Sequence, residues 1–210
     1  MAPLPIGPTP LQAPARAVKE LEYAVNDLGL RGVLIISNIR NRDLGERRFW
    51  KFWAKAEEMG VPVFIHPHGF SEPDRLQKYF LSNTVGQPLE ETLAMLSLIH
   101  EGVMEKHPKL KIVIAHGGGY LPYYVGRSDQ AYRNGGEQAA NISKPPSEYL
   151  RHFYYDSVIF DPAMLEFLVK KVGANKVMMG SDYPWVETDA VGYVRKSRGL
   201  SKETKDRILG

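Results

Sequence analysis

The chain has 210 residues, 43% hydrophobic and 24% charged, with 27 basic against 24 acidic side chains and a formal net charge of +3. This composition is typical of one globular domain large enough to bury a core. The sequence has no cluster of basic residues with interleaved aromatic residues, so nothing in it indicates nucleic-acid binding. The chain contains no cysteine, which excludes disulfides and thiolate ligands, so a metal would have to bind through His, Asp or Glu.

Targeting signals do not stand out in the sequence. No apolar run reaches the roughly 20 residues of a membrane span, and the N-terminal segment lacks the basic start and apolar stretch of a signal peptide. We therefore expect a cytoplasmic protein that binds neither membrane nor nucleic acid. Because five prolines fall within the first fourteen residues, we expect residues 1–15 to form an extended, proline-rich arm ahead of a domain over residues 16–210.

Helices and strands are expected to alternate through this domain, on the basis of apolar spacing, β-branched runs and cap residues. In chain order we expect helix 16–28, strand 31–39, helix 47–59, strand 61–66, helix 89–107, strand 111–115, helix 121–133, strand 153–158, helix 161–172, strand 176–179 and short helices at 190–197 and 202–209. Asp161 is the expected N-cap of the helix over 161–172. Five alternations with strands of the buried type predict a parallel α/β sheet with right-handed crossovers.

Three of the predicted strands end in residues that can titrate or bind metal. VFIHPHG places His66 and then His68 after one strand, IVIAHGGG places His116 after the next, and VMMGSDYPW places Asp182 after the last. A single histidine at a strand end is more often structural, and an aspartate after Gly-Ser is often a helix N-cap. Their joint occurrence favours one shared site, because the carboxyl ends of parallel strands form one face, where imidazole and carboxylate suit a divalent metal.

The three glycines that follow His116 raise a separate question. Glycine permits a sharp left-handed turn and also removes the side chains that would keep a ligand away from the backbone. We expect both effects here, with the strand turning sharply and space left open above it.

Several stretches together resemble the amidohydrolase-2 family, and within it the branch similar to aminocarboxymuconate-semialdehyde decarboxylase. They are VFIHPHG, RLQKYFLSNTVGQPLEET, PKLKIVIAHGGGYLPYYVGR, YYDS and KVMMGSDYPW. The resemblance implies a (β/α)8 TIM-barrel fold with one divalent metal, most commonly zinc and sometimes manganese. It also implies a small-molecule carboxylic acid as substrate and a homodimer.

The resemblance implies roles for individual residues. His66 and Asp182 match the family's metal ligands, Asp182 also taking part in proton transfer, and His116 matches the histidine that acts as acid and base. Four further residues are candidates for substrate binding: His68, Phe80, Arg127 and Trp185. Plainer alternatives are solvent exposure for His68, an ion pair for Arg127 and loop packing for Trp185. Phe80 stands where the decarboxylase carries a tryptophan, so the pocket would be aromatic but smaller.

The chain departs from the family pattern at its ends. The family's first strand ends in an HxH or ExH motif that supplies two more ligands, and nothing similar precedes Arg31. We therefore expect an incomplete barrel, truncated at both ends, with about five β/α units that correspond to barrel strands four to eight. Three functions stay open: a metal-dependent decarboxylase of an unsaturated or aromatic acid, a hydrolase or hydratase of a lactone or oxo-acid, and an inactive remnant.

Overall fold

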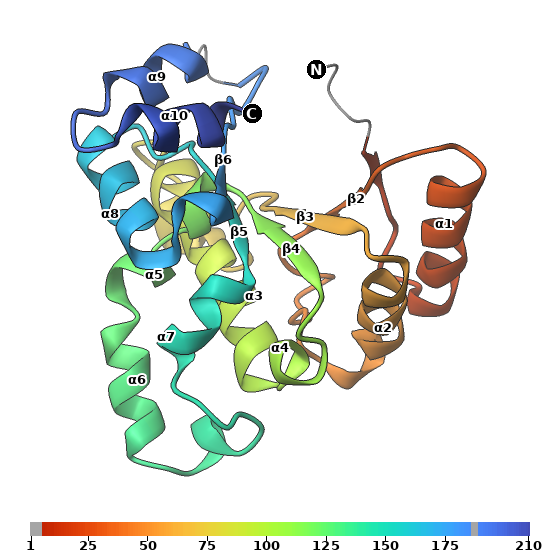
Figure 1. Ribbon diagram of the computed structural model, residues 1–210. Helices are drawn as coiled ribbons and strands as arrows, with labels where there is room; N and C mark the ends of the chain where they lie inside the picture. The colour runs from red at the N-terminus through yellow and green to blue at the C-terminus, as the bar shows by residue number, and fades with distance from the viewer. Residues whose placement is uncertain (1–5, 186–188) are drawn as a thin grey trace.

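A single parallel sheet of six strands organises the molecule, in the computed structural model of Figure 1, which describes residues 6–185 and 189–210. Each strand pairs with its neighbour in sequence, as in the wall of a (β/α) barrel. The described part of this wall is open, because β1 and β6 are its two outer strands. The strands are β1 (Gly7–Pro8), β2 (Val33–Ile36), β3 (Pro62–His66), β4 (Lys111–Ile114), β5 (Tyr154–Asp156) and β6 (Val177–Met178).

The helices lie around the outside of the fan of strands (Figure 1). They are α1 (Pro14–Asn26), α2 (Trp50–Met59), α3 (Gln87–His100), α4 (Val103–Lys106), α5 (Leu121–Tyr124), α6 (Gly126–Arg133), α7 (Pro146–Tyr149), α8 (Pro162–Val172), α9 (Ala190–Lys196) and α10 (Lys202–Leu209). The alternation expected from the sequence is confirmed, with each strand shorter than its apolar run. No helix among the described residues is long and apolar enough to cross a bilayer.

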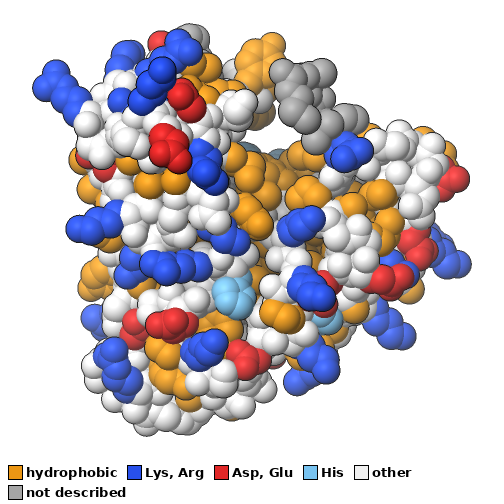
Figure 2. All heavy atoms as spheres, in the orientation of Figure 1, with side chains coloured by type: hydrophobic (Ala, Val, Ile, Leu, Met, Phe, Trp, Pro, Cys, Tyr) orange, Lys and Arg blue, Asp and Glu red, His pale blue; other side chains and the backbone are white. Residues whose placement is uncertain are grey.

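The two faces of the sheet differ in burial. In β2, Val33 and Ile35 are buried under the helical layer, whereas Ile36 is 40% exposed. Because successive strand residues point to opposite faces, one face packs on the helices and the other faces an open hollow. Figure 2 shows hydrophobic side chains gathered in the hollow between the β2–β3 part of the molecule and the C-terminal helices.

The described part of the proline-rich segment belongs to the sheet, where an extended arm was expected. Gly7 and Pro8 pair with Val33 and Leu34, and Leu11 is buried. Proline lacks an N–H group, so a short outer strand is the place in a sheet that tolerates it. Residues 1–5 of the expected arm lie outside the described residues.

The long helix expected over residues 89–107 is interrupted, which corrects that expectation. Helix α3 ends at His100, and α4 begins after Gly102, whose φ of 79° is left-handed. A Cβ atom at Gly102 would lie 2.8 Å from the carbonyl oxygen of Asn141, so a side chain has no room there. The expected cap of α8 is confirmed, since the backbone N–H of Ala163 donates to Asp161 Oδ1 at 2.8 Å.

Candidate active site

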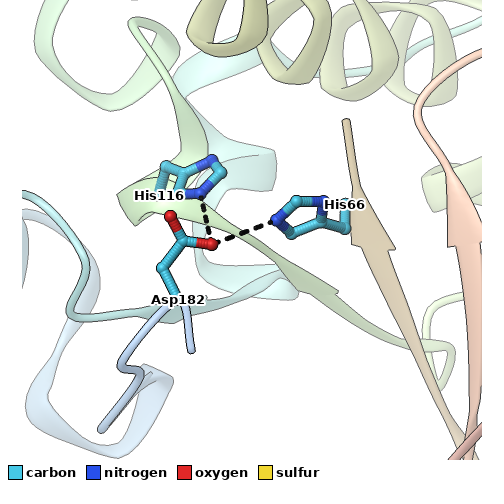
Figure 3. A group of neighbouring side chains, drawn as sticks. All are labelled: His66, His116 and Asp182. Atoms are coloured by element: carbon cyan, nitrogen blue, oxygen red, sulfur yellow. Dashed lines mark ion pairs between the residues drawn. The ribbon is translucent and has the colours of Figure 1, made fainter. Parts of the chain in front are cut away.

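Three side chains from three strand ends converge at the carboxyl face of the sheet (Figure 3). His66 ends β3, His116 follows β4, and Asp182 lies in the loop after β6. Asp182 Oδ1 is 3.6 Å from His66 Nε2 and 3.7 Å from His116 Nε2. One potential ligand atom from each residue lies within 4.8 Å of the others, so the structure brings together the three residues that the strand-end pattern predicted.

This donor set fits a divalent metal. Two ligands about 2.1 Å from a tetrahedral cation lie ~3.4 Å from each other, close to the separations around Asp182 Oδ1. The Nδ1 atom of His66 lies 2.8 Å from the carbonyl oxygen of Pro67, which can only accept a hydrogen bond. The proton of the neutral ring is therefore on Nδ1, and the lone pair on Nε2 faces Asp182, as in a metal-binding histidine.

His116 is paired on its other side with a buried acid. Its Nδ1 atom is 2.5 Å from Oε1 of Glu91, which lies on α3 with no exposed surface. Burial raises the pKa of Glu91 to about 7. Burial lowers the pKa of His116, but the hydrogen bond and charge of Glu91 outweigh it and raise the pKa to about 9. In the absence of metal, the pair therefore retains a proton around neutral pH.

A second buried acid holds the loop that carries His116. Asp156 at the end of β5 accepts hydrogen bonds from the backbone N–H groups of Gly117, at 3.1 Å, and Val158, at 3.0 Å. Burial raises the pKa of Asp156. Neither Asp156 nor Glu91 was predicted from the sequence as a site residue. Asp156 follows the same strand-end pattern as His66 and could have been found by it, within the YYDS stretch.

The backbone at the site adopts uncommon conformations. His116 and Asp182 have φ values of 48° and 56°, in the left-handed region that residues other than glycine rarely enter. Such residues persist only where the surrounding structure holds them, and they concentrate at functional sites. Here the two loops that leave β4 and β6 both turn at the residue that faces the shared centre.

The glycines after His116 allow other segments of the chain to pack closely against the loop. Residues 117–119 all have positive φ values. A Cβ atom at Gly118 would lie 2.7 Å from the ring of Tyr155, and one at Gly119 would lie 2.1 Å from the carbonyl oxygen of Pro88. The sharp turn is as expected. Gly119 lines the first of the two hollows described below, but the Cβ positions of Gly118 and Gly119 face β5 and α3, so the expected open space is smaller than predicted.

Two hollows meet at Asp182. The first, of about 500 Å³, contains His116 and Asp182 in a largely apolar wall and has the size of a small-molecule pocket. The second, of about 420 Å³, contains His66, Asp156 and Asp182. Apolar residues that line the first hollow are Pro88, Val158, Ile159, Phe160 and Met164.

The four predicted substrate-binding residues lie in different places. Trp185 lines the second hollow and is 81% exposed. His68 and Phe80 are exposed and line neither hollow. Arg127 lines a separate hollow of about 680 Å³ formed by α3, α5 and α6. The described structure therefore brings only Trp185 to the edge of the site, and the binding roles of all four residues stay predictions.

The fold and site define a class of protein, a (β/α) barrel-type domain with a His/Asp group that could hold a metal ion at the carboxyl ends of its strands. The model of the amidohydrolase family matches residues 5–210, so the chain belongs to that family. The resemblance noted in the sequence is thereby confirmed.

Known relatives of this chain include several decarboxylases. It is 34% identical over 208 residues to the 2-amino-3-carboxymuconate-6-semialdehyde decarboxylase of Dictyostelium discoideum, covering 98% of this chain and 58% of the relative. The structure is similar to 5-carboxyvanillate decarboxylase from Sphingomonas paucimobilis, with a TM-score of 0.87, 26% identity, and coverage of 95% of this chain and 62% of the other.

A third similar protein is a dihydroxybenzoic acid decarboxylase from Polaromonas sp. JS666, whose structure holds manganese and the inhibitor 2-nitroresorcinol. The TM-score is 0.84 at 25% identity, covering 95% of this chain and 64% of the other. These comparisons confirm the expected barrel-type fold. The chain spans about three-fifths of the length of these relatives.

Proposed function

We propose that this chain forms part or all of a metal-dependent decarboxylase, a carbon–carbon lyase that acts on a small unsaturated or aromatic carboxylic acid. The observation that carries the proposal is the convergence of His66, His116 and Asp182 beside a largely apolar hollow large enough for a ring. The relatives described above support it, because each of them is named as a decarboxylase.

We assign His66 and Asp182 to the metal and His116 to the proton. A divalent cation bound there would polarise a substrate oxygen. Loss of CO2 leaves an electron pair on a substrate carbon, and one proton must be delivered to that carbon. Protonated His116 can donate this proton from Nε2, while its Nδ1–H group stays hydrogen-bonded to Glu91. Nε2 cannot hold a metal and carry this proton at once, so the two roles of His116 exclude each other.

We propose zinc as the metal, because imidazole is a favoured zinc ligand and His66 presents its Nε2 atom to the site. Manganese is the alternative, supported by the ion in the Polaromonas relative. The metal content of the purified chain, measured by mass spectrometry after equal exposure to both ions, distinguishes them. A stoichiometric amount of zinc supports the proposal, and selective retention of manganese contradicts it. The expected homodimer and cytoplasmic location stay predictions.

The activity test measures CO2 release by the metal-loaded chain from 2-amino-3-carboxymuconate-6-semialdehyde, 5-carboxyvanillate and a dihydroxybenzoate. We expect His116→Asn to lower kcat by about 10²- to 10⁴-fold while metal is retained, because general acid–base catalysis contributes that much. Asp182→Asn should lose metal. His107→Asn is the matched control, because His107 also pairs with a glutamate, Glu57, away from this site.

Other products would contradict the proposal. A hydrated or hydrolysed product without CO2 would indicate the hydrolase or hydratase alternative. A chain that turns over none of these acids and retains neither metal would indicate the inactive alternative. Loss of metal from His116→Asn would assign His116 as a ligand and remove it as the proton donor.

A further inference from the structure

Helix α3 carries two adjacent buried carboxylates that are used differently. Glu90 accepts hydrogen bonds from the backbone N–H of Ser71 and the side-chain amide of Asn38, both at 2.7 Å, and from the Ser37 hydroxyl at 3.3 Å. These three donors explain why Glu90 can be buried. Their hydrogen bonds connect α3 to the loops that follow β2 and β3. Its role is structural.

Glu91 has no comparable set of partners. Its Oε1 contacts His116 Nδ1, and its Oε2 finds no hydrogen-bond partner among the described residues. Burying a carboxylate with one oxygen unpaired costs free energy that an apolar residue at the same position would avoid. The contact with His116 is therefore the feature of this residue that needs a functional explanation.

We propose that Glu91 is a positioning residue that selects the Nδ1–H tautomer of His116 and directs its Nε2 lone pair at the site. A carboxylate only accepts hydrogen bonds, so the ring nitrogen that faces it must carry the hydrogen. The other nitrogen, Nε2, then faces Asp182 Oδ1 at 3.7 Å. In a histidine, the hydrogen bond that one ring nitrogen makes thus fixes the tautomer and determines which form the other nitrogen presents to a substrate or metal.

The local backbone cannot supply this orientation by itself. His116 has a left-handed φ of 48°, and the three residues after it are glycines without side chains to confine the ring. The neighbouring ring of His66, with its centroid 5.0 Å away, contacts the same imidazole edge-on but offers it no carboxylate. Glu91 approaches from a different element, the rigid helix α3, which suits a residue that must hold another one in place.

This inference rests on the proposed function only in the task that it gives to the Nε2 lone pair of His116, which is to accept a proton. Once His116 has given up a proton to substrate, Nε2 must be free to accept the next one, and a ring turned into the Nε2–H form would not accept it there. The tautomer itself is a property of the folded chain and can be measured without any substrate.

The test uses chain labelled with ¹⁵N in its six histidines, with His116 assigned through His116→Asn. Long-range ¹H–¹⁵N spectra of the metal-free protein are recorded up to a pH at which the ring is neutral. We expect the Nδ1–H pattern in the unsubstituted chain and in Glu91→Gln, whose amide oxygen can still accept. Glu91→Ala should show the Nε2–H form or a mixture. Glu90→Gln, one residue away, should leave the pattern unchanged, and His107 beside Glu57 serves as an internal reference.

Activity provides the second measurement. Glu91→Ala should lower kcat by about 10- to 100-fold, the usual cost of removing such a supporting partner, with a smaller change in KM and with partial recovery in Glu91→Gln. An Nε2–H ring in the unsubstituted chain overturns the inference whether or not the variants fold. So does an unchanged Nδ1–H ring in folded Glu91→Ala. If the tautomers are as expected but no acid is turned over, the proposed function fails and the positioning role stands.

Discussion

At the scale of single residues, His116 is held between two acids. Glu91 faces its Nδ1 atom and Asp182 faces its Nε2 atom, while Asp156 anchors the loop that follows it. Together these acids favour the protonated ring and outweigh the burial that opposes it. The charge state of this residue is therefore coupled to the fold, and both can be tested by unfolding experiments.

Stability of the metal-free chain should fall as pH rises through the range in which His116 titrates. Because the folded pKa of about 9 exceeds the ordinary value of 6.5, folded protein binds the proton more tightly, so this stabilisation is present below pH 6.5 and lost by about pH 9. The raised pKa of Glu91, about 7 against 4.5, acts in the same direction at lower pH.

The measurement is urea unfolding at several pH values with a chelator present, comparing the unsubstituted chain with His116→Gln. Between pH 6.5 and 9, the free energy of unfolding of the unsubstituted chain should fall by up to ~3 kcal/mol more than that of His116→Gln. His107→Gln should retain the decline. Parallel profiles for the unsubstituted chain and His116→Gln would contradict the coupling.

Asp156 permits a test that separates hydrogen bonding from charge. Asp156→Ala leaves the buried N–H groups of Gly117 and Val158 without an acceptor and should cost about 2–4 kcal/mol. Asp156→Asn keeps an acceptor oxygen in the same place and should cost less than half as much. Urea denaturation at pH 7 gives both values, and equal losses would mean that the charge, rather than the hydrogen bonds, holds the loop.

At the scale of elements, the loop after β4 is where helix α3, strand β5 and the site meet. Its glycines adopt left-handed conformations under direct contact from both neighbours. The same loop brings His116 to Glu91 and Gly117 to Asp156. Tight packing of the loop and precise placement of the histidine are thus one structural feature.

A methyl group should be tolerated at one glycine and not at another. Gly119→Ala places Cβ 2.1 Å from the Pro88 carbonyl oxygen at a φ of +60°, so we expect a loss of about 3 kcal/mol or more in unfolding free energy. Gly126→Ala is the matched control, because nothing lies within 4 Å of its Cβ and the residue begins helix α6. It should be neutral or stabilising by up to ~1 kcal/mol. Equal effects of the two substitutions on thermal unfolding would contradict the packing argument.

At the scale of the whole molecule, the described sheet has an exposed apolar face and two outer strands. Ile36 on β2 and Met178 on β6 are 40% and 37% exposed. Figure 2 shows hydrophobic side chains in the hollow between the β2–β3 part of the molecule and the C-terminal helices. Outer strands with unpaired backbone groups, next to apolar surface, favour contacts with other chains.

The 210-residue chain should therefore self-associate, and a charge in the hollow should weaken that association. Burying a methionine or isoleucine side chain contributes about 1.5–3 kcal/mol, so Met178→Lys or Ile36→Lys should raise the dissociation constant roughly tenfold or more. Tyr23→Lys on α1, also an exposed apolar position, is the control and should leave it unchanged. Analytical ultracentrifugation measures all four chains. Association that responds to Tyr23→Lys alone would place the contact on the helical layer instead.

Much of the fold could be predicted because its signals are local. Apolar periodicity and cap residues identified the order of strands and helices, and Asp161 caps α8 as predicted. The two-residue strand β1 was missed, because a Gly-Pro pair has no β-branched pattern and its partner is a strand many residues away. Gly102 interrupts the expected long helix for a similar reason, since the constraint comes from Asn141 in another segment.

The meeting of His66, His116 and Asp182 could be predicted from the sequence, because parallel strands bring their carboxyl ends to one face whatever the details of packing. The pairing of each histidine with its acid follows only from the packing of the folded chain. Glu90 and Glu91 are neighbours on one helix, yet only Glu91 reaches His116, and that depends on how α3 docks against β4. This packing also placed Arg127 in a hollow apart from His116. Such contacts join segments far apart in sequence, so no local pattern encodes them.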